Sequence, residues 1–454
     1  MSAGPATAIG AVVGQRRAYP GPRAAAIIGR ARALEGAGPR TGATSAPLVV
    51  DHALGSTLVD PDGNEWLDLA GSFAAATLGH AHPELVAAIV DQAPRVAHVA
   101  SSALSEARVT FEEALLSIAP PGVHRVLLGL SGADANDTAL KLARTATGRR
   151  EFLAFSGGYF GRAGGVVGID GKAAFRTAVG LDADAHFLPY PYRYRWPLGD
   201  PGNDEALAEQ ALALVRAAVE GRASGVGPLA AIVLEPVQGS GGIVIPPPGF
   251  LAGLRALCDR HGILLVFDEV QCGFGRTGRT WAAEHWGVVP DLMTVGKGIG
   301  GGLAVSAVIG SSAAMSHWAP GTHTSTFLGN AVNLAAGAAA IRVLVQERLA
   351  ARAGRLGEGA LATLREALDD EPSVGEVRGL GLLIGIELVS DRETREPDPR
   401  RATAVLEALF ERGVVSTSAG HDDNVLKISP PLTIPEPELR EGLGQVVAAI
   451  RGVR

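Results

Sequence analysis

Lys297 lies between two glycines, in Gly296-Lys297-Gly298, directly behind an apolar stretch that ends at Val295. Glycine allows close approach of the backbone, so the amine of such a lysine can be held near a small reactive molecule. A second apolar stretch, residues 264–267, ends in the carboxylate of Asp268. Pyridoxal phosphate (PLP) requires an amine for its Schiff base and an anion for its pyridinium nitrogen. The two residues together predict PLP chemistry.

A possible phosphate site lies upstream, where the segment Leu130 to Asp137 leads from an apolar run into a helix. Apolar residues recur on this helix at helical spacing, at Ala135, Ala139 and Ala143. Free backbone N–H groups and the helix dipole make such a helix start a natural seat for a phosphate. A plain capped helix start explains the segment equally well, because capping residues are common.

The elements that position these groups are short apolar runs between residues 126 and 310, with helical stretches between them. This pattern predicts a mostly parallel sheet covered by helices. One helix is expected from Gly249 to His261, stopped by Gly262. The expected strands are 126–128, 152–155, 231–234, 263–267 and 306–309. Ligands of such sheets lie outside the carboxyl ends of the strands, where the candidate residues fall.

A smaller domain is expected from the rest of the chain. Residues 57–68 alternate around a Pro-Asp-Gly turn and predict a hairpin. A helical stretch from Ala331 to Leu349, strands near 382–388 and 425–428, and a final helix predict a compact α+β unit. The prediction is therefore an α/β protein with an N-terminal segment 1–85, a large domain 86–330 and a C-terminal small domain 331–454.

The composition of the chain limits the kinds of partner that the protein is expected to bind. The chain has 454 residues, is 47% hydrophobic and carries a formal net charge of −7 without a basic block, which argues against nucleic acid. No stretch runs to membrane-spanning length, and Met1 to Gly14 lacks the pattern of a secretion signal. The two cysteines, Cys258 and Cys272, cannot build a disulfide framework and favour a cytoplasmic location. No metal site is predicted.

The chain resembles the class III aminotransferases of PLP fold type I from about Leu58 to Leu432. The resemblance rests on several ordered motifs, and their order and spacing make chance agreement very improbable. They are Leu78-Gly79-His80-Ala81-His82-Pro83, Ser131 to Asn136, Tyr159-Phe160-Gly161-Arg162, Glu235-Pro236-Val237-Gln238-Gly239, Asp268-Glu269-Val270-Gln271, Gly296-Lys297-Gly298 and Ser325-Thr326-Phe327.

The resemblance implies a role for each residue around the cofactor ring. Lys297 would form the Schiff base with PLP and then carry the proton of the substrate carbon. Asp268 would keep the pyridine nitrogen protonated. Val270 and Tyr159 would pack on opposite faces of the ring, and Gln271 would donate to its phenolic oxygen.

The same resemblance implies a phosphate site and a partner subunit. Gly132 and Ala133 would supply backbone N–H groups, and Glu235 would orient groups beside the ring. Thr326 would complete the phosphate site of the neighbouring subunit, which implies an obligate homodimer.

The chain departs from the family at its substrate residues. Many relatives pair an arginine with a glutamate that opens to admit an α-carboxylate; here these positions are Lys427 and Ser240. A lysine lacks the bidentate fork of arginine, so recognition of an α-carboxylate should be looser. Phe160 replaces a usual histidine and would add an apolar wall. Arg162 would either read a distal carboxylate or pair with a structural acid.

These changes favour an ω-amine or an amino sugar as substrate, as in the 6′-aminotransferase branch of aminoglycoside biosynthesis. The aromatic residues of segment 189–196 would form either a lid over a polyol ring or a packed loop. The predicted reaction is transfer of an amino group between such an amine and an oxo acceptor through Lys297.

Three other functions compete with this interpretation. Lys297 and Asp268 would also serve a PLP-dependent epimerase, an eliminating lyase or dehydratase, or a decarboxylase. A catalytically silent binding protein on this fold is a further alternative, which the intact Lys297, Asp268 and Gln271 argue against. A nicotinamide dehydrogenase would need Gly-x-Gly-x-x-Gly after an early strand, whereas the similar run at 296–301 follows a late one.

Overall fold

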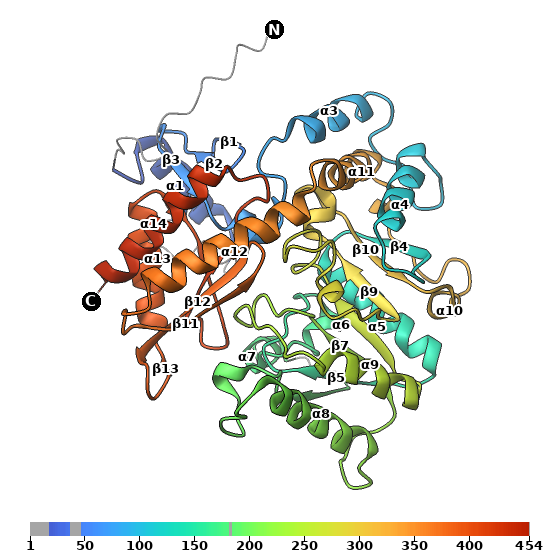
Figure 1. Ribbon diagram of the computed structural model, residues 1–454. Coiled ribbons are helices and arrows are strands. Elements are labelled where there is room, and N and C mark those ends of the chain that lie inside the picture. Colours follow the sequence, from blue (N-terminus) through green and yellow to red (C-terminus); the bar gives the residue numbers. More distant parts are fainter. Residues whose placement is uncertain (1–17, 37–46, 181–183, 454) are drawn as a thin grey trace.

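The computed structural model describes residues 18–36, 47–180 and 184–453 (Figure 1). The interpretation of Met1 to Gly14 lies outside these residues. In the described part of the chain, no helix has the length and apolarity needed to cross a membrane.

A seven-stranded sheet forms the centre of the large domain, in the order β4-β10-β9-β8-β7-β5-β6. Its strands are β4 (Arg125–Gly129), β5 (Glu151–Phe155), β6 (Ala185–Leu188), β7 (Leu229–Leu234), β8 (Leu264–Asp268), β9 (Leu292–Val295) and β10 (Ser306–Gly310). β10 pairs antiparallel with both β4 and β9, while the other pairs are parallel. The predicted mostly parallel sheet is confirmed.

Helices cover both faces of this sheet, and alternation along each strand assigns its side chains to the two sides. Ala231 and Val233 of β7 pack in a cluster with helix α5 (Gly132–Thr147). Ile232 and Leu234 pack instead with α8 (Asp204–Glu220) and α9 (Phe250–His261). Burial on both faces explains why these strands are continuous apolar runs in the sequence.

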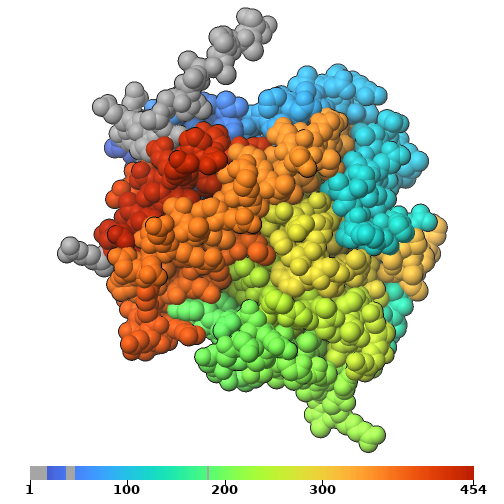
Figure 2. All heavy atoms as spheres, in the orientation of Figure 1, coloured from blue at the N-terminus to red at the C-terminus, as the bar shows by residue number. Residues whose placement is uncertain are grey.

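The small domain is built from both ends of the chain. The predicted hairpin is present as β2 (Thr57–Val59) and β3 (Glu65–Asp68), in a four-stranded sheet ordered β1-β2-β3-β14. β1 spans His52–Leu54, and β14 (Val414–Val415) pairs parallel with β3. A second sheet is ordered β11-β12-β16-β15, with β13 paired to β12. N-terminal strands and C-terminal helices consequently lie side by side (Figures 1 and 2).

The remaining elements complete these two units. The strands are β11 (Val374–Leu380), β12 (Leu383–Asp391), β13 (Glu396–Pro397), β15 (Thr417–Ala419) and β16 (Val425–Ile428). The helices are α1 (Pro22–Leu34), α2 (Gly71–Ala74), α3 (Pro83–Gln92), α4 (Glu106–Ser117), α6 (Gly164–Val167), α7 (Ala173–Thr177), α10 (Ser312–Met315), α11 (Ala331–Gln346), α12 (Leu349–Ala367), α13 (Pro399–Glu411) and α14 (Glu436–Gly452). Short 3₁₀ turns are η1 (Arg193–Arg195), η2 (Ala282–His285), η3 (Lys297–Gly300) and η4 (Thr326–Gly329).

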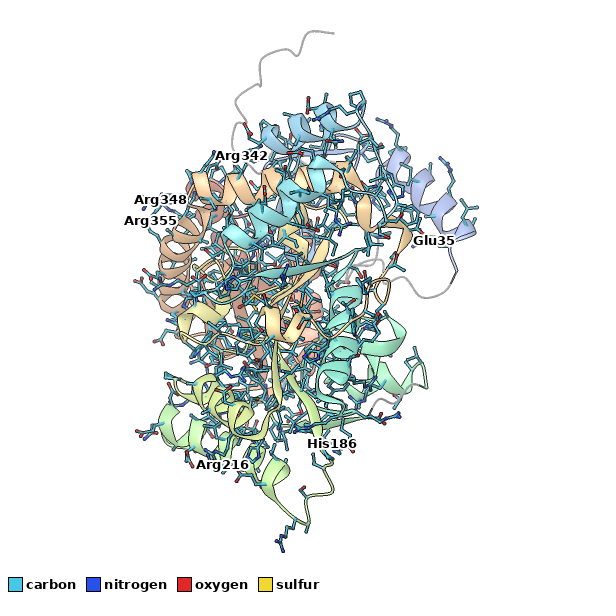
Figure 3. All side chains as sticks on the ribbon, turned by 90° about the vertical axis from the view of Figure 1, so that its right-hand side faces the viewer. Glu35, His186, Arg216, Arg342, Arg348 and Arg355 are labelled. Atoms are coloured by element: carbon cyan, nitrogen blue, oxygen red, sulfur yellow. The ribbon has the colours of Figure 1, made fainter. Side chains whose placement is uncertain are left out.

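Helix α11 bears on the predicted division at residue 331. It packs against α3, α4 and η3 of the large domain. Arg342 on α11 is exposed. Farther along the chain, Arg348 and Arg355 are exposed on the same side of the molecule (Figure 3). We therefore propose that α11 belongs to the large domain by packing and that the C-terminal unit begins with α12.

A buried ion-pair network joins the two domains at Glu387 of β12, whose side chain is 1% exposed. Its carboxylate lies 2.7 Å from Nη2 of Arg378 and 2.6 Å from Nε of Arg195, and it accepts a hydrogen bond from the hydroxyl of Tyr192. Burial alone would raise the pKa of Glu387, but Arg378, Tyr192 and Arg195 lower it below its ordinary value. The network therefore ties segment 192–195 of the large domain to the small domain.

We expect Glu387→Ala to lower the free energy of unfolding by about 3–5 kcal/mol, because it removes the buried carboxylate that pairs with both Arg378 and Arg195. Urea unfolding followed by circular dichroism measures this change. Glu376→Ala is the matched control: Glu376 also pairs with Arg378, at 2.8 Å, but its side chain is 35% exposed. Its loss should cost less than about 1 kcal/mol. Equal effects of the two variants would contradict a buried network centred on Glu387.

Candidate active site

Three neighbouring strands of the large sheet end beside one another and carry the main candidate residues. β7, β8 and β9 are adjacent and parallel. Glu235 follows β7, Asp268 ends β8 and Lys297 lies two residues beyond β9. The structure therefore brings Asp268 and Lys297, which the sequence singled out, together at the carboxyl ends of these strands.

Asp268 is buried and held by two donors. The side-chain amide of Asn136 on α5 donates to its Oδ2 at 2.7 Å, and the backbone N–H of Val270 donates to its Oδ1 at 2.8 Å. Burial raises the pKa of Asp268, while these hydrogen bonds and the Lys297 charge partly oppose the rise. A buried carboxylate of this kind is stabilised by a cationic partner, which a pyridinium nitrogen would supply.

Lys297 begins the 3₁₀ turn η3 with a backbone in the left-handed region, φ 46°. This conformation costs about 1–2 kcal/mol for a residue other than glycine and is common at functional sites. A Cβ at Gly298 would lie 2.7 Å from side-chain atoms of both Phe274 and Thr77, so a larger residue there would have to displace them. Burial lowers the pKa of Lys297, and the acids Asp268 and Glu235 oppose this only in part. A lower pKa favours the neutral, nucleophilic amine.

Glu235 is a second buried carboxylate at the carboxyl ends of these strands. It accepts the backbone N–H groups of Tyr159 at 3.1 Å and Gly239 at 2.9 Å. Burial and the nearby charge of Asp268 raise the pKa of Glu235 to about 8. Glu235 therefore fixes the loop that carries Tyr159.

The start of α5 has the features expected of a phosphate seat. The side chain of Ser131 accepts the N–H of Asp134 at 3.2 Å, which is an ordinary helix cap. The N–H groups of Gly132 and Ala133 find no hydrogen-bond acceptor among the residues that the structure describes. The plain helix cap is therefore present, and it leaves two donors free. The phosphate site at these two N–H groups stays a prediction.

Val270 lies between this helix start and the lysine turn. A Cβ at Gly132 would be 2.9 Å from Val270 Cγ1, and one at Gly296 would be 3.3 Å from the same atom. Gln271 is buried against Gly239, where a Cβ would meet its Oε1. Tyr159 lies edge-on to Phe175 with ring centroids 6.3 Å apart. Their predicted contacts with the cofactor ring stay predictions.

Residues 40–450 match the family model described as aminotransferase class III. The chain belongs to the class III aminotransferase family. It is 38% identical to the leucine/methionine racemase of Thermococcus litoralis over 90% of this chain and 92% of the relative. It is also 36% identical to the 5-aminovalerate aminotransferase of Pseudomonas aeruginosa over 87% of this chain and 92% of that protein.

Solved structures agree with this assignment. The amine transaminase from an uncultivated Pseudomonas species, in its PLP-bound form, is 31% identical with a TM-score of 0.85, covering 93% of this chain and all of that one. PLP is the cofactor of class III aminotransferases, so this enzyme uses it too. The free N–H groups at α5, the buried Asp268 and the Lys297 amine fit the phosphate, ring nitrogen and aldehyde of PLP.

The predicted substrate residues of this class III aminotransferase are found in different surroundings. Ser240 accepts the N–H of Gly420 through its backbone carbonyl, at 3.0 Å. The exposed guanidinium of Arg162 stacks on the Phe175 ring, 3.4 Å from its centroid. Phe160 is 2% exposed and packs in the apolar cluster around α5, so the structure places it in the core. Its role as a wall toward substrate stays a prediction.

The aromatic segment 189–196 is a packed loop rather than a lid. Tyr190, Tyr192 and Trp196 are buried in the cluster around α8 and α9. The hydroxyl of Tyr190 donates to the carbonyls of Glu235 and Pro236, at 3.1 and 3.0 Å. Because the Tyr190 hydroxyl bonds to these backbone carbonyls, the segment helps to hold the Glu235 loop in place.

Thr326 is exposed on η4 in the single chain. The neighbouring Ser101 and Thr324 hydroxyls lie 2.8 Å apart, and Phe327 contacts His98. The predicted contact of Thr326 with a phosphate in a second subunit stays a prediction.

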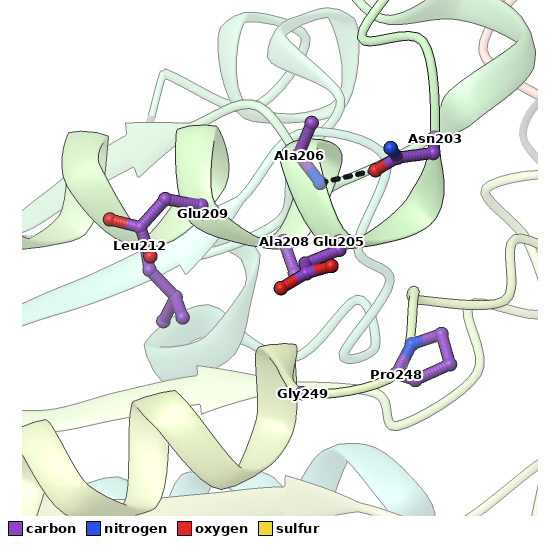
Figure 4. A pocket seen from close by; sticks show the side chains of 8 residues that line it. All are labelled: Asn203, Glu205, Ala206, Ala208, Glu209, Leu212, Pro248 and Gly249. Carbon is purple, nitrogen blue, oxygen red and sulfur yellow. Dashed lines mark hydrogen bonds between the residues drawn. The ribbon is translucent and has the colours of Figure 1, made fainter.

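A surface pocket between α8 and the loop before α9 lies away from this site (Figure 4). Glu205 and Glu209 give it an acidic rim, and Asn203 caps α8 by accepting the N–H of Ala206 at 2.8 Å. None of the predicted site residues lines it, so we do not assign the reaction there.

Two positioning residues were missed by sequence reasoning. Asn136 holds Asp268, and Thr294 on β9 in turn donates to Oδ1 of Asn136 at 2.7 Å. The available signal was a polar residue on the apolar, sheet-facing side of α5, next to Ala135. A buried asparagine needs partners, and here its partner is the carboxylate of Asp268.

We expect Gly132→Ala to weaken PLP binding about 10- to 100-fold, because the new methyl group would press on Val270 at the phosphate seat, an overpacking cost of about 1–3 kcal/mol. Reconstitution of the apoenzyme with increasing PLP, followed by cofactor absorbance, measures the affinity. Gly164→Ala is the control, since nothing lies within 4 Å of a Cβ there. Unchanged affinity in Gly132→Ala would contradict the assigned seat.

Proposed function

We propose that this enzyme transfers an amino group from an ω-amine or amino sugar to an oxo acceptor. The observation that carries the proposal is the arrangement of Lys297 and Asp268 at adjacent strand ends, beside free N–H groups at the start of α5. The relative named for 5-aminovalerate supports an ω-amine. The amino-sugar option and the aminoglycoside 6′ branch rest on Ser240, Phe160 and Lys427 alone.

Each residue has a defined task in this reaction. Bound PLP supplies an electron sink for negative charge at the substrate carbon. Lys297 takes the proton from that carbon onto its Nζ, which a lowered pKa makes available as a base. The Asp268 carboxylate balances positive charge at the ring nitrogen, and Asn136 holds its orientation. The buried Glu235 keeps the Tyr159 loop in place.

The enzyme acts as a homodimer in this proposal, with Thr326 reaching the phosphate of the other subunit. The exposed η4 turn supports it, because Phe327 next to Thr326 presents a large exposed apolar side chain. A cytoplasmic location is also proposed, consistent with the two free, buried cysteines.

The test is a half-reaction without any oxo acceptor. Purified holoenzyme is mixed with a panel of ω-amines, amino sugars and α-amino acids, and loss of the yellow cofactor band reports conversion to the pyridoxamine form. Stoichiometric oxo product with at least one ω-amine or amino sugar supports the proposal. Absence of conversion with every amine contradicts it.

Racemisation of an amino acid is a second candidate, favoured by the 38% identity to a leucine/methionine racemase. A racemase must deliver a proton to both faces of the substrate carbon, whereas amino transfer requires only the Lys297 amine. Incubation of one enantiomer in deuterated water separates the two. Deuterated product of both configurations without oxo acid identifies a racemase, and release of carbon dioxide or ammonia would identify a decarboxylase or lyase.

A further inference from the structure

The loop that connects β15 to β16, residues 420–423, joins the small domain to two loops of the large domain. The backbone N–H of Gly420 donates to the carbonyl of Ser240 at 3.0 Å. The Lys172 ammonium donates to the carbonyl of Gly420 and lies 3.5 Å from the carboxylate of Asp423. One small-domain loop therefore contacts both the Ser240 loop and the segment that carries Lys172.

His421 of this loop packs against the segment that carries Tyr159. A Cβ on Gly157 would lie 2.1 Å from Nε2 of His421, and the backbone of Gly157 has a positive φ of 81°. Glycine suits this position because it tolerates the left-handed conformation and leaves room for the imidazole. Two residues farther on, the N–H of Tyr159 donates to Glu235 at 3.1 Å. The imidazole therefore bears on the backbone that positions Tyr159.

Gln238 has an unsatisfied acceptor at the same place. Its side chain is 1% exposed, and its Nε2 donates to the carbonyl of Ser156 at 2.9 Å. Among the residues that the structure describes, its Oε1 has no hydrogen-bond partner. This oxygen lies 3.0 Å from the Cβ position of Gly157 that the His421 ring also approaches. A buried acceptor without a donor is costly, and an imidazole N–H is a suitable donor.

The surroundings of His421 make its charge sensitive to pH. The titratable groups that face its ring are Lys172, Tyr192, Arg195, Glu387 and Asp422. Glu387 is already paired with Arg195, at 2.6 Å. Burial of part of the ring, then the charge of Lys172, lowers the pKa of His421 below its ordinary value. The residue is otherwise exposed, so solvent can protonate it. Near neutral pH the imidazole is therefore uncharged.

We propose that His421 is a positioning residue, which donates its Nε2–H to Gln238 and so holds the Tyr159 and Ser240 loops of the large domain against the small domain. Its effect on the reaction rests on the proposed function, in which Tyr159 packs on a face of the cofactor ring. Protonation would place a second positive charge beside Lys172. Because the folded structure favours the neutral imidazole, the contact weakens as the pH falls below about 6.5.

The first test follows hydrogen–deuterium exchange of the holoenzyme by mass spectrometry, in peptides that cover residues 155–160 and 238–244. Between about pH 7.5 and about pH 5, wild-type exchange there should rise about 3- to 10-fold relative to peptides of α14, as expected for one lost hydrogen bond. His421→Gln keeps a donor but does not titrate, so it should abolish this rise. His317→Gln, at an exposed histidine after α10, is the matched control and should behave like wild type.

The comparison of wild type with His421→Gln isolates the imidazole from other groups that titrate in this range. Asp170 lies in the segment next to Lys172, and burial raises its pKa to about 6. It is present in both proteins, so its titration cannot produce a difference between them. A rise in exchange at acid pH that persists in His421→Gln overturns the proposal.

The second test is a double-mutant cycle near neutral pH with the same readout. His421→Phe keeps a ring but lacks a donor, and Gln238→Met removes the acceptor, so each should raise exchange of residues 155–160. With the hydrogen bond present, the double variant should exchange no faster than the faster single variant. Wild-type exchange in His421→Phe, or effects that multiply in the double variant, would contradict the bond. These measurements use no amine, so they decide the role of His421 even where no amine reacts and the proposed function fails.

Discussion

Lys297→Ala is expected to abolish amino transfer, lowering kcat by at least about 10⁴-fold. The variant removes both the nucleophile that attaches the cofactor and the base that takes the substrate proton at Nζ. The amine of wild-type Lys297 is partly buried, and burial lowers its pKa. At the carboxyl ends of these strands it is therefore suited to both tasks. Single-turnover kinetics with the best amine of the panel measures the loss.

The chain has only four lysines, Lys141, Lys172, Lys297 and Lys427, which makes the assignment easy to check. Borohydride reduction followed by peptide mapping should place the cofactor on Lys297. Lys427 is the informative competitor, since its amine is buried nearby with a lowered pKa. Lys141→Ala, which removes a surface pair with Asp137, should leave the rate unchanged. Label on Lys427, or full activity of Lys297→Ala, would refute the mechanism.

Asp268→Asn is expected to lower kcat about 10²- to 10³-fold while the fold survives. The change removes the charge that balances the ring nitrogen, and loss of a buried charge pair costs about 3–5 kcal/mol. The amide has nearly the same shape, so the effect should fall on the chemical step. Stopped-flow rates of the half-reaction, with urea unfolding in parallel, separate catalysis from stability.

The control for Asp268 is Asp137→Asn on the exposed side of α5, where a carboxylate pairs with Lys141 at 2.8 Å. It should retain the wild-type rate. Asn136→Ala should fall between the two, because it leaves the charge of Asp268 but removes one of its donors. A wild-type rate in Asp268→Asn would show that the ring nitrogen has no need of this carboxylate.

Local patterns in the sequence were sufficient to predict the sheet and a candidate site at the carboxyl ends of its strands. Continuous apolar runs predicted strands buried on both faces, and the carboxylate and lysine at their ends predicted a site there. The hairpin at 57–68 and the helix ending at Gly262 were likewise confirmed. These features depend on neighbours within a few residues, which is why one sequence carries them. The sequence did not specify that β10 runs antiparallel to its neighbours, because an apolar run does not show in which direction its strand lies in the sheet.

Only the tertiary structure decided which distant residues meet. Asn136 and Asp268 are 132 positions apart and touch because α5 crosses the sheet above β8. The structure packs Phe160 in the apolar cluster around α5, and it packs the aromatic segment 189–196 around Tyr190 against α8 and α9. The sequence by itself determined the family and the cofactor, and it singled out Lys297 as the candidate for the reactive lysine. The burial of Lys427 on β16 required folding, since burial of a charge depends on what the rest of the chain places around it.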